Sequence, residues 1–227
     1  MGKSYNDSLK VSIILPTYNR DFLLCRCTNS VFDQTYKNWE LIIADDGSSD
    51  DTHTIVKQII QKNKNIHYHR NPINIGLPSN RNISLSFATG DLIWFIEDDM
   101  ILDSNCLKCL VETWNEISSI EPRLGVICPS IAQYGQEKTA RRNFLNFVRN
   151  QKKQKIKNYP CYIDKWTGLI FRNLSSNFSK IVEIEDCHSC SLYTKNIFKK
   201  IMYTKKIYTG NYIGEESDFH FQLRKLG

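Results

Sequence analysis

The chain has 227 residues, of which 41% are hydrophobic and 24% are charged. This length can bury one sizeable core but is short for two, so we expect a single domain over residues 1–227. The net charge of +6 is too small to indicate a nucleic-acid partner. No apolar run approaches the roughly 18 residues of a membrane span, and residues 1–10 are polar, which predicts a cytoplasmic protein.

The eight cysteines raise the question of zinc or disulfides. Two pairs, Cys106/Cys109 and Cys187/Cys190, have the C-x-x-C spacing of zinc ligands. The interval between the pairs is far longer than the roughly 15–20 residues of a compact zinc module, and the first pair lies in a helical pattern. Reduced thiols that act as small buried side chains are therefore the favoured interpretation.

The first half of the chain alternates short apolar runs with amphipathic segments. The apolar runs 11–15, 40–44 and 92–96 have apolar residues at consecutive positions, which is typical of parallel strands covered on both faces. A further strand is predicted at 125–129. The pattern indicates an α/β fold with a mostly parallel central sheet between helices.

The helices predicted between these strands follow from apolar residues at helical spacing. They lie at about 23–32, 55–60, 78–90 and 104–114, with Ser104 as the expected cap of the last one. Beyond residue 160 we expect a strand at 181–184 and helices at 196–201 and 215–226.

The segment 138–157 is strongly basic, with eight lysines and arginines and no acidic residue. It is interrupted by the apolar residues Phe144, Leu145, Phe147 and Val148. One interpretation is a solvated surface segment. The other is a surface that meets an anionic acceptor or the inner face of a membrane.

Three polar clusters follow the predicted strands, at 16–20, 45–50 and 97–99. Ligands of an open parallel sheet collect beyond the carboxyl ends of its strands, so these clusters predict one site. The adjacent carboxylates Glu97, Asp98 and Asp99 repel one another unless a positive charge is present. A Mg²⁺ or Mn²⁺ ion shared with diphosphate oxygens would supply that charge. The alternative is an acidic turn that caps the following helix.

Several motifs together resemble glycosyltransferase family 2. They are Val11 to Arg20, Ser30 to Tyr36, Trp39 to Ser48, Asn74 to Gly76, Ser79 to Asn82, Ala88 to Asp91, Glu97 to Asp99, and the late acidic segment Gly214 to Phe219. The resemblance implies a GT-A fold with a Rossmann-like sheet. It also implies a donor-binding half at about 8–103 and an acceptor-binding half at about 104–227.

The resemblance further implies an inverting transfer of a sugar from a nucleotide-diphosphate sugar, with a UDP-sugar favoured, to an acceptor hydroxyl of a glycan or lipid-linked molecule in polysaccharide or cell-envelope synthesis. Its implied donor-binding residues are Pro16, Thr17, Tyr18, Arg20, Asp45, Asp46, Arg81 and Asp98. Asp46 would accept a hydrogen bond from the base, and Asp99 with Glu97 would bind the metal. Glu216 is the implied general base, with Glu215 beside it.

Some assignments stay open. Glu97 and Glu216 stand where the family commonly has aspartate. His188 is either a contact of the acceptor or diphosphate, or a histidine satisfied by local backbone. The competing functions are a non-catalytic nucleotide-sugar-binding protein and a nucleotidyltransferase. The second is disfavoured because residues 16–20 lack the glycines of a triphosphate-binding loop.

Overall fold

The computed structural model describes residues 9–129, 161–163, 170–172, 190–204 and 215–225, and the statements below concern those residues. The chain divides into two compact units. One unit comprises residues 1–128 and 189–227, and the other comprises residues 129–188. The predicted strand at 181–184 and the basic segment 138–157 lie outside the described residues.

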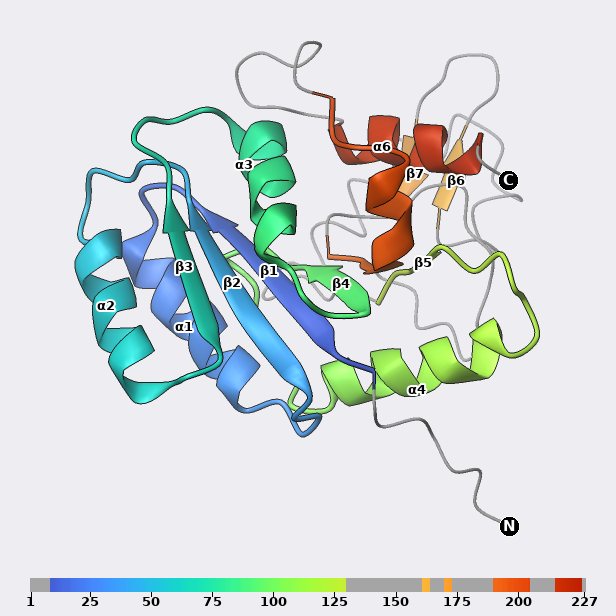
Figure 1. Ribbon diagram of the computed structural model, residues 1–227, viewed down its shortest axis with the longest axis horizontal. Helices are drawn as coiled ribbons and strands as arrows, with labels where there is room; N and C mark the ends of the chain where they lie inside the picture. The colour runs from blue at the N-terminus through green and yellow to red at the C-terminus, as the bar shows by residue number, and fades with distance from the viewer. Residues whose placement is uncertain (1–8, 130–160, 164–169, 173–189, 205–214, 226–227) are drawn as a thin grey trace, which may run out of the picture. The chain divides into compact units, whose positions relative to one another are not determined.

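The first unit is built on a six-stranded sheet with the order β3-β2-β1-β4-β8-β5 (Figure 1). The parallel strands are β1 (Val11–Thr17), β2 (Trp39–Asp45), β3 (Ile66–Arg70) and β4 (Leu92–Phe95). The short strand β8 (Leu192–Thr194) runs antiparallel to β4 and to β5 (Val126–Ile127). β1 has a parallel neighbour on each side, and all seven of its residues are buried.

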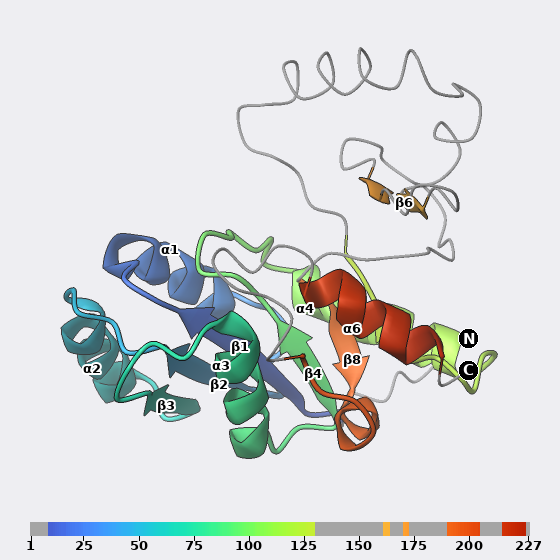
Figure 2. The same ribbon diagram turned by 90° about the horizontal axis from the view of Figure 1, so that it is seen from above.

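Helices cover both faces of this sheet. In chain order they are α1 (Asp21–Phe32), α2 (Thr52–Lys62), α3 (Leu77–Ser84) with the 3₁₀ turn η1 (Leu85–Phe87), α4 (Cys106–Ser118), the 3₁₀ turn η2 (Lys195–Lys199) and α6 (Glu215–Arg224). Figure 2 shows α1 and α3 on opposite sides of β1 and β2. This two-sided cover explains why the strands are apolar at consecutive positions.

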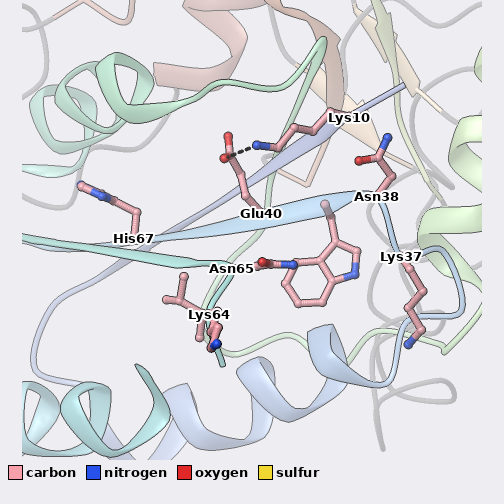
Figure 3. Close-up of a pocket in the computed structure, with 9 residues that line it drawn as sticks. Lys10, Lys37, Asn38, Glu40, Lys64, Asn65 and His67 are labelled. Atoms are coloured by element: carbon pink, nitrogen blue, oxygen red, sulfur yellow. Dashed lines mark hydrogen bonds and ion pairs between the residues drawn. The ribbon is translucent and has the colours of Figure 1, made fainter. Parts of the chain in front are cut away.

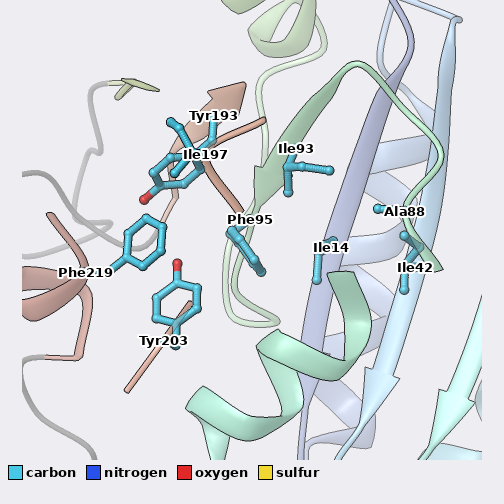
Figure 4. Packing of buried hydrophobic residues seen from close by; sticks show 9 residues of the cluster. All are labelled: Ile14, Ile42, Ala88, Ile93, Phe95, Tyr193, Ile197, Tyr203 and Phe219. Carbon is cyan, nitrogen blue, oxygen red and sulfur yellow. The ribbon is translucent and has the colours of Figure 1, made fainter. Parts of the chain in front are cut away.

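An aromatic and aliphatic cluster fills one face of the sheet (Figure 4). Ile14, Ile42, Ile93 and Phe95 contribute from three adjacent strands. Tyr193, Ile197, Tyr203 and Phe219 come from the last third of the chain. The ring centroids of Tyr203 and Phe219 lie 4.6 Å apart, so α6 packs directly on this core. Burying a large aromatic side chain contributes about 1.5–3 kcal/mol.

The predicted strands at 11–15, 40–44 and 92–96 are confirmed, as is a short strand within 125–129. The sequence interpretation missed β3 and β8. β3 reads Ile66-His67-Tyr68-His69-Arg70 and lies at an edge of the sheet, so it has no continuous apolar run. β8 comes late in the chain and was not separated from its polar surroundings. It forms a strand through its pairing with β4 and β5.

Two helix predictions need correction. Ser104 is not the N-cap of α4, because the helix begins at Cys106 and Asn105 is its flanking residue. The backbone carbonyl of Ser104 instead accepts a hydrogen bond from the Thr35 amide at 2.8 Å. The helix predicted at 196–201 is a 3₁₀ turn over Lys195–Lys199.

In the second unit, two strands are described. β6 (Cys161–Ile163) and β7 (Ile170–Arg172) form an antiparallel pair in which Tyr162 lies opposite Phe171. The sequence did not predict this pair. Among the described residues of the whole chain, no helix combines the length and apolar character needed to cross a bilayer.

Candidate active site

The three polar clusters lie side by side in the structure. β2, β1 and β4 are neighbours in the sheet, and the clusters follow their carboxyl ends. The backbone amide of Asp46 donates to the carbonyl of Thr17 at 2.9 Å, which joins the first two loops. The hydroxyl of Thr17 donates to Asp98 Oδ2 at 2.8 Å, which joins the first and third. The predicted convergence at one sheet edge is therefore confirmed.

Arg20 pairs with both aspartates of the acidic cluster. Its Nη1 lies 3.1 Å from Asp98 Oδ1 and 3.3 Å from Asp99 Oδ2. The two carboxylates differ in environment, because the Asp98 side chain is 7% exposed and the Asp99 side chain is 51% exposed. Asp98 thus holds the loops together, while Asp99 faces solvent and can accept a ligand.

Burial dominates the electrostatics of Asp98. It raises the pKa of the carboxyl more than the hydrogen bond from Thr17 and the charge of Arg20 lower it. The pKa of Arg20 is raised, chiefly by the charge of Asp98 and to a smaller extent by Asp99. When both are ionised, Asp98 and Asp99 carry two negative charges, whereas their shared partner Arg20 carries one positive charge. A further cation would stabilise the ionised cluster.

Asp45 and Asp46 are buried at the end of β2. The Asp45 carboxylate accepts hydrogen bonds from the Tyr68 hydroxyl at 2.7 Å and the Ser48 amide at 2.8 Å. Asp46 is 3% exposed. Its oxygens accept from the Asn71 side chain and from the amides of Ile75 and Gly76.

Both carboxylates therefore shape the loops beside the site. To accept a hydrogen bond from a nucleotide base, as the resemblance implies, Asp46 would have to use oxygen atoms that already accept hydrogen bonds within the chain. Gly47 completes this turn with a φ of +78°, and a Cβ there would lie 2.7 Å from the backbone carbon of Ile73.

The residues Asn71 and Asn80 also organise the site, and the sequence interpretation overlooked Asn71. Its side-chain amide donates both to Asp46 and to Asn80 Oδ1, at 2.9 and 3.0 Å. Asn80 in turn donates to the carbonyl of Ala44 at 2.7 Å. Asn71 directly follows β3, so recognising that strand would have drawn attention to it.

Arg81 is 1% exposed and lies beneath the acidic cluster. Its guanidinium carbon is 5.7 Å from the ring centre of Phe95 and 5.2 Å from that of Tyr203. One of its nitrogens lies 3.7 Å from Glu97 Oε1. Arg81 thus partly neutralises Glu97 from within the core.

The remaining predicted residues differ in how far the structure describes them. Pro16 lies in β1 and pairs in register with Ala44, and Tyr18 is 45% exposed beside the site. Glu215 and Glu216 lie in the first turn of α6, but their side chains are not among the described ones. His188 lies outside the described residues.

The acidic cluster is compatible with a metal ion that binds together with a phosphate-bearing ligand. Among the residues that the structure describes, no three His, Cys, Asp or Glu side chains form a metal-binding group. Asp99 is exposed and oxygen-bearing, as a hard cation requires. Mg²⁺ and Mn²⁺ commonly complete their coordination with phosphate oxygens and water, so one exposed carboxylate is compatible with such an ion.

A groove lies at the other end of the strands from the acidic cluster, around the amino ends of β2 and β3 (Figure 3). Its lining residues are Lys10, Lys37, Asn38, Trp39, Glu40, Lys64, Asn65, Ile66 and His67. Lys10 spans part of it through a 2.7 Å ion pair with Glu40. Because the carboxyl ends of the strands carry the carboxylate cluster, we do not assign the donor to this groove.

Comparison with known sequences settles the family. Residues 12–202 match the family described as Glycosyl transferase family 2. The chain belongs to this family.

Two relatives of this chain act on lipid-linked substrates according to their names. One is the GalNAc(5)-diNAcBac-PP-undecaprenol beta-1,3-glucosyltransferase of Campylobacter jejuni, which is 37% identical over 108 residues. The other is the UDP-Glc:alpha-D-GlcNAc-diphosphoundecaprenol beta-1,3-glucosyltransferase of Escherichia coli, which is 37% identical over 102 residues. The matches cover 47% and 45% of this chain but span only 35% and 40% of those enzymes.

Solved structures of glycosyltransferases share the GT-A fold found here. A mannosyltransferase from Pyrobaculum calidifontis, solved in complex with GDP-Man and Mn²⁺, superposes with a TM-score of 0.65. The identity is 14%, and the superposition covers 99% of this chain and 56% of that one. At this identity the likeness establishes the fold alone. The predicted GT-A fold is confirmed.

Proposed function

We propose that this family 2 chain transfers a sugar from a UDP-sugar to a hydroxyl of a lipid-linked glycan, with inversion at the anomeric carbon. The observation that carries the proposal is the cluster of Thr17, Arg20, Asp98 and Asp99 at the carboxyl edge of the sheet. It combines the solvent-facing carboxylate of Asp99 with the exposed guanidinium of Arg20, which suits a metal-bound diphosphate.

The donor-binding half would comprise residues 8–103. Tyr18, exposed beside the site, is suited to contact the nucleoside. UDP is favoured because the relative from Escherichia coli is named for a UDP-Glc donor. The structural neighbour was solved with GDP-Man, so GDP is the alternative to be measured.

The acceptor would be bound by residues 104–227. Both named relatives act on undecaprenol-linked molecules, which supports an acceptor with a membrane-anchored diphosphate. The basic residues of segment 138–157 would then meet an anionic surface at the inner face of the membrane. Such a contact would be peripheral, and the reaction would then take place on the cytoplasmic side.

In the proposed mechanism, the chain's own residues perform three tasks. Asp99 would hold a Mg²⁺ or Mn²⁺ ion, whose charge stabilises the diphosphate as it leaves. Arg20 would donate charge-assisted hydrogen bonds to oxygen atoms of the same diphosphate. Glu216 in the first turn of α6 would accept the proton of the attacking hydroxyl, because a hydroxyl is a poor nucleophile at neutral pH. Attack from the face opposite the diphosphate inverts the anomeric carbon.

The donor is tested by calorimetric titration with UDP and GDP, with Mn²⁺ present or removed by a chelator. We expect UDP to bind more tightly than GDP and to require the cation. In the variant Asp99→Asn the effect of the cation should disappear. Equal affinity of the native chain for UDP with and without the cation would refute the metal role.

The base is tested by measuring release of UDP from a UDP-sugar in the presence of an undecaprenyl-diphosphate-linked acceptor. Glu216→Gln should lower the rate by about a hundred- to ten-thousand-fold and leave UDP affinity unchanged. Glu215→Gln is the matched control, because it removes a carboxylate from the same helical turn. Loss of transfer in Glu215→Gln alone would assign the base to that residue instead. Donor binding without transfer in the native chain would favour a non-catalytic nucleotide-sugar-binding protein.

A further inference from the structure

Arg20 occupies the position at Asp99 where a cation would bind. A single nitrogen of its guanidinium lies 3.1 Å from Asp98 and 3.3 Å from Asp99. Bonds of this kind between two charged groups are stronger than neutral hydrogen bonds. Without a ligand, the solvent-facing carboxylate of the site is therefore already partly neutralised by the chain itself.

The backbone of Arg20 is fixed, whereas its side chain is exposed. The Arg20 carbonyl accepts hydrogen bonds from the amides of Leu23 and Leu24, each at 3.1 Å. The preceding residue, Asn19, is held by Ser48 Oγ and the Ser49 amide at 2.9 and 2.7 Å. The Arg20 side chain is 50% exposed. It can therefore change partners by rotating its side-chain torsions, without a change in the loop.

The charges of the cluster require Arg20 to leave Asp99 when a cation binds there. Glu97 has a buried cationic partner in Arg81, at 3.7 Å. Asp98 and Asp99 share Arg20. A divalent ion at Asp99 would lie close to the Arg20 guanidinium, and the two positive groups would repel one another. Arg20 must therefore leave Asp99 before the ion can bind well.

We propose that Arg20 is a gating residue for the metal. Its guanidinium covers Asp99 in the absence of donor, yields that carboxylate to the incoming cation, and turns to the diphosphate oxygens. The proposal rests on the proposed function, because it needs a diphosphate donor and a cation. It adds that the cation and the nucleoside diphosphate bind cooperatively, since the diphosphate provides the new partner that Arg20 requires.

The gate is tested by titrating the chain with Mn²⁺ alone, followed by the electron paramagnetic resonance signal of the free ion. The same titration is repeated with saturating UDP. In Arg20→Gln we expect Mn²⁺ alone to bind about three- to tenfold more tightly than in the native chain. The factor by which UDP increases Mn²⁺ affinity should fall to a similar extent. Arg20→Lys keeps the positive charge and should stay close to the native values.

Arg26→Gln is the matched control. Arg26 is an exposed residue of α1, the helix that follows Arg20, so the variant also removes one positive charge. Its affinity for Mn²⁺ alone should not change. If Arg20→Gln binds Mn²⁺ alone no more tightly than the native chain, the gate is refuted while the proposed function stands. If the native chain fails to bind UDP with Mn²⁺, the proposed function and the gate are both refuted.

Discussion

Replacing Asp46 by alanine should destabilise the fold as well as the site. The structure places three donors on this carboxylate, namely the Asn71 side chain and the amides of Ile75 and Gly76, at 2.9, 3.0 and 2.8 Å. A hydrogen bond to a charged acceptor contributes about 1.5–3 kcal/mol, and a buried donor without a partner costs about 1–3 kcal/mol. Because such losses are not additive, we expect Asp46→Ala to lower the free energy of unfolding by about 3–5 kcal/mol.

This loss is measured by urea unfolding. At a slope of about 2 kcal/mol per molar urea, the midpoint should fall by roughly 1.5–2.5 M. Asp51→Ala is the control, because Asp51 is exposed in the same connection and provides no side-chain cap to α2, so its midpoint should barely change. If the Asp46 carboxylate served only to bind the nucleotide base, its removal would leave the urea midpoint unchanged. An unchanged midpoint for Asp46→Ala, together with weaker UDP binding, would refute the structural role.

Three further substitutions test one close backbone approach and two hydrogen-bonded side chains of the sheet. Gly90→Ala should lower the free energy of unfolding, measured by urea denaturation, by about 1–3 kcal/mol, because the Cβ of the alanine would lie 2.6 Å from the Ser12 amide nitrogen. An unchanged urea midpoint would contradict this close approach. Burial raises the pKa of Glu40, but hydrogen bonds from Lys10, Ser12 and Thr89 outweigh it and lower that pKa to about 2. Since an unfolded glutamate has a pKa of about 4.3, this stabilisation is complete above that pH and is lost as the pH falls to about 2. The difference in melting temperature between the native chain and Glu40→Gln should therefore shrink over that window, and a constant difference would refute the argument. Tyr68→Phe removes the hydroxyl that donates to Asp45 at 2.7 Å, and should lower the free energy of unfolding by about 1–3 kcal/mol; thermal denaturation would show no shift if the bond were unimportant.

The sequence by itself determined the central strands and the edge of the sheet that bears the site. The run 92–96 is apolar at every position and the run 11–15 at every position except Ser12, a pattern typical of a strand covered on both faces. The polar residues that follow them had to lie at the carboxyl ends of those strands. The motifs in 11–103 also indicated the family, and the family match over residues 12–202 confirms it.

Tertiary structure decided what each polar side chain does at that edge. The sequence presents Asp46, Asp98 and Asp99 as equivalent carboxylates. In the folded chain, Asp46 and Asp98 are buried, whereas the side chain of Asp99 is 51% exposed. Asp46 is buried because β3, a strand without a local signal, brings Asn71 beside it. The side chain of Arg20 reaches Asp98 and Asp99 only because β4 lies beside β1. These contacts join residues about 25 to 80 positions apart, and a local pattern carries no information about partners at such a distance.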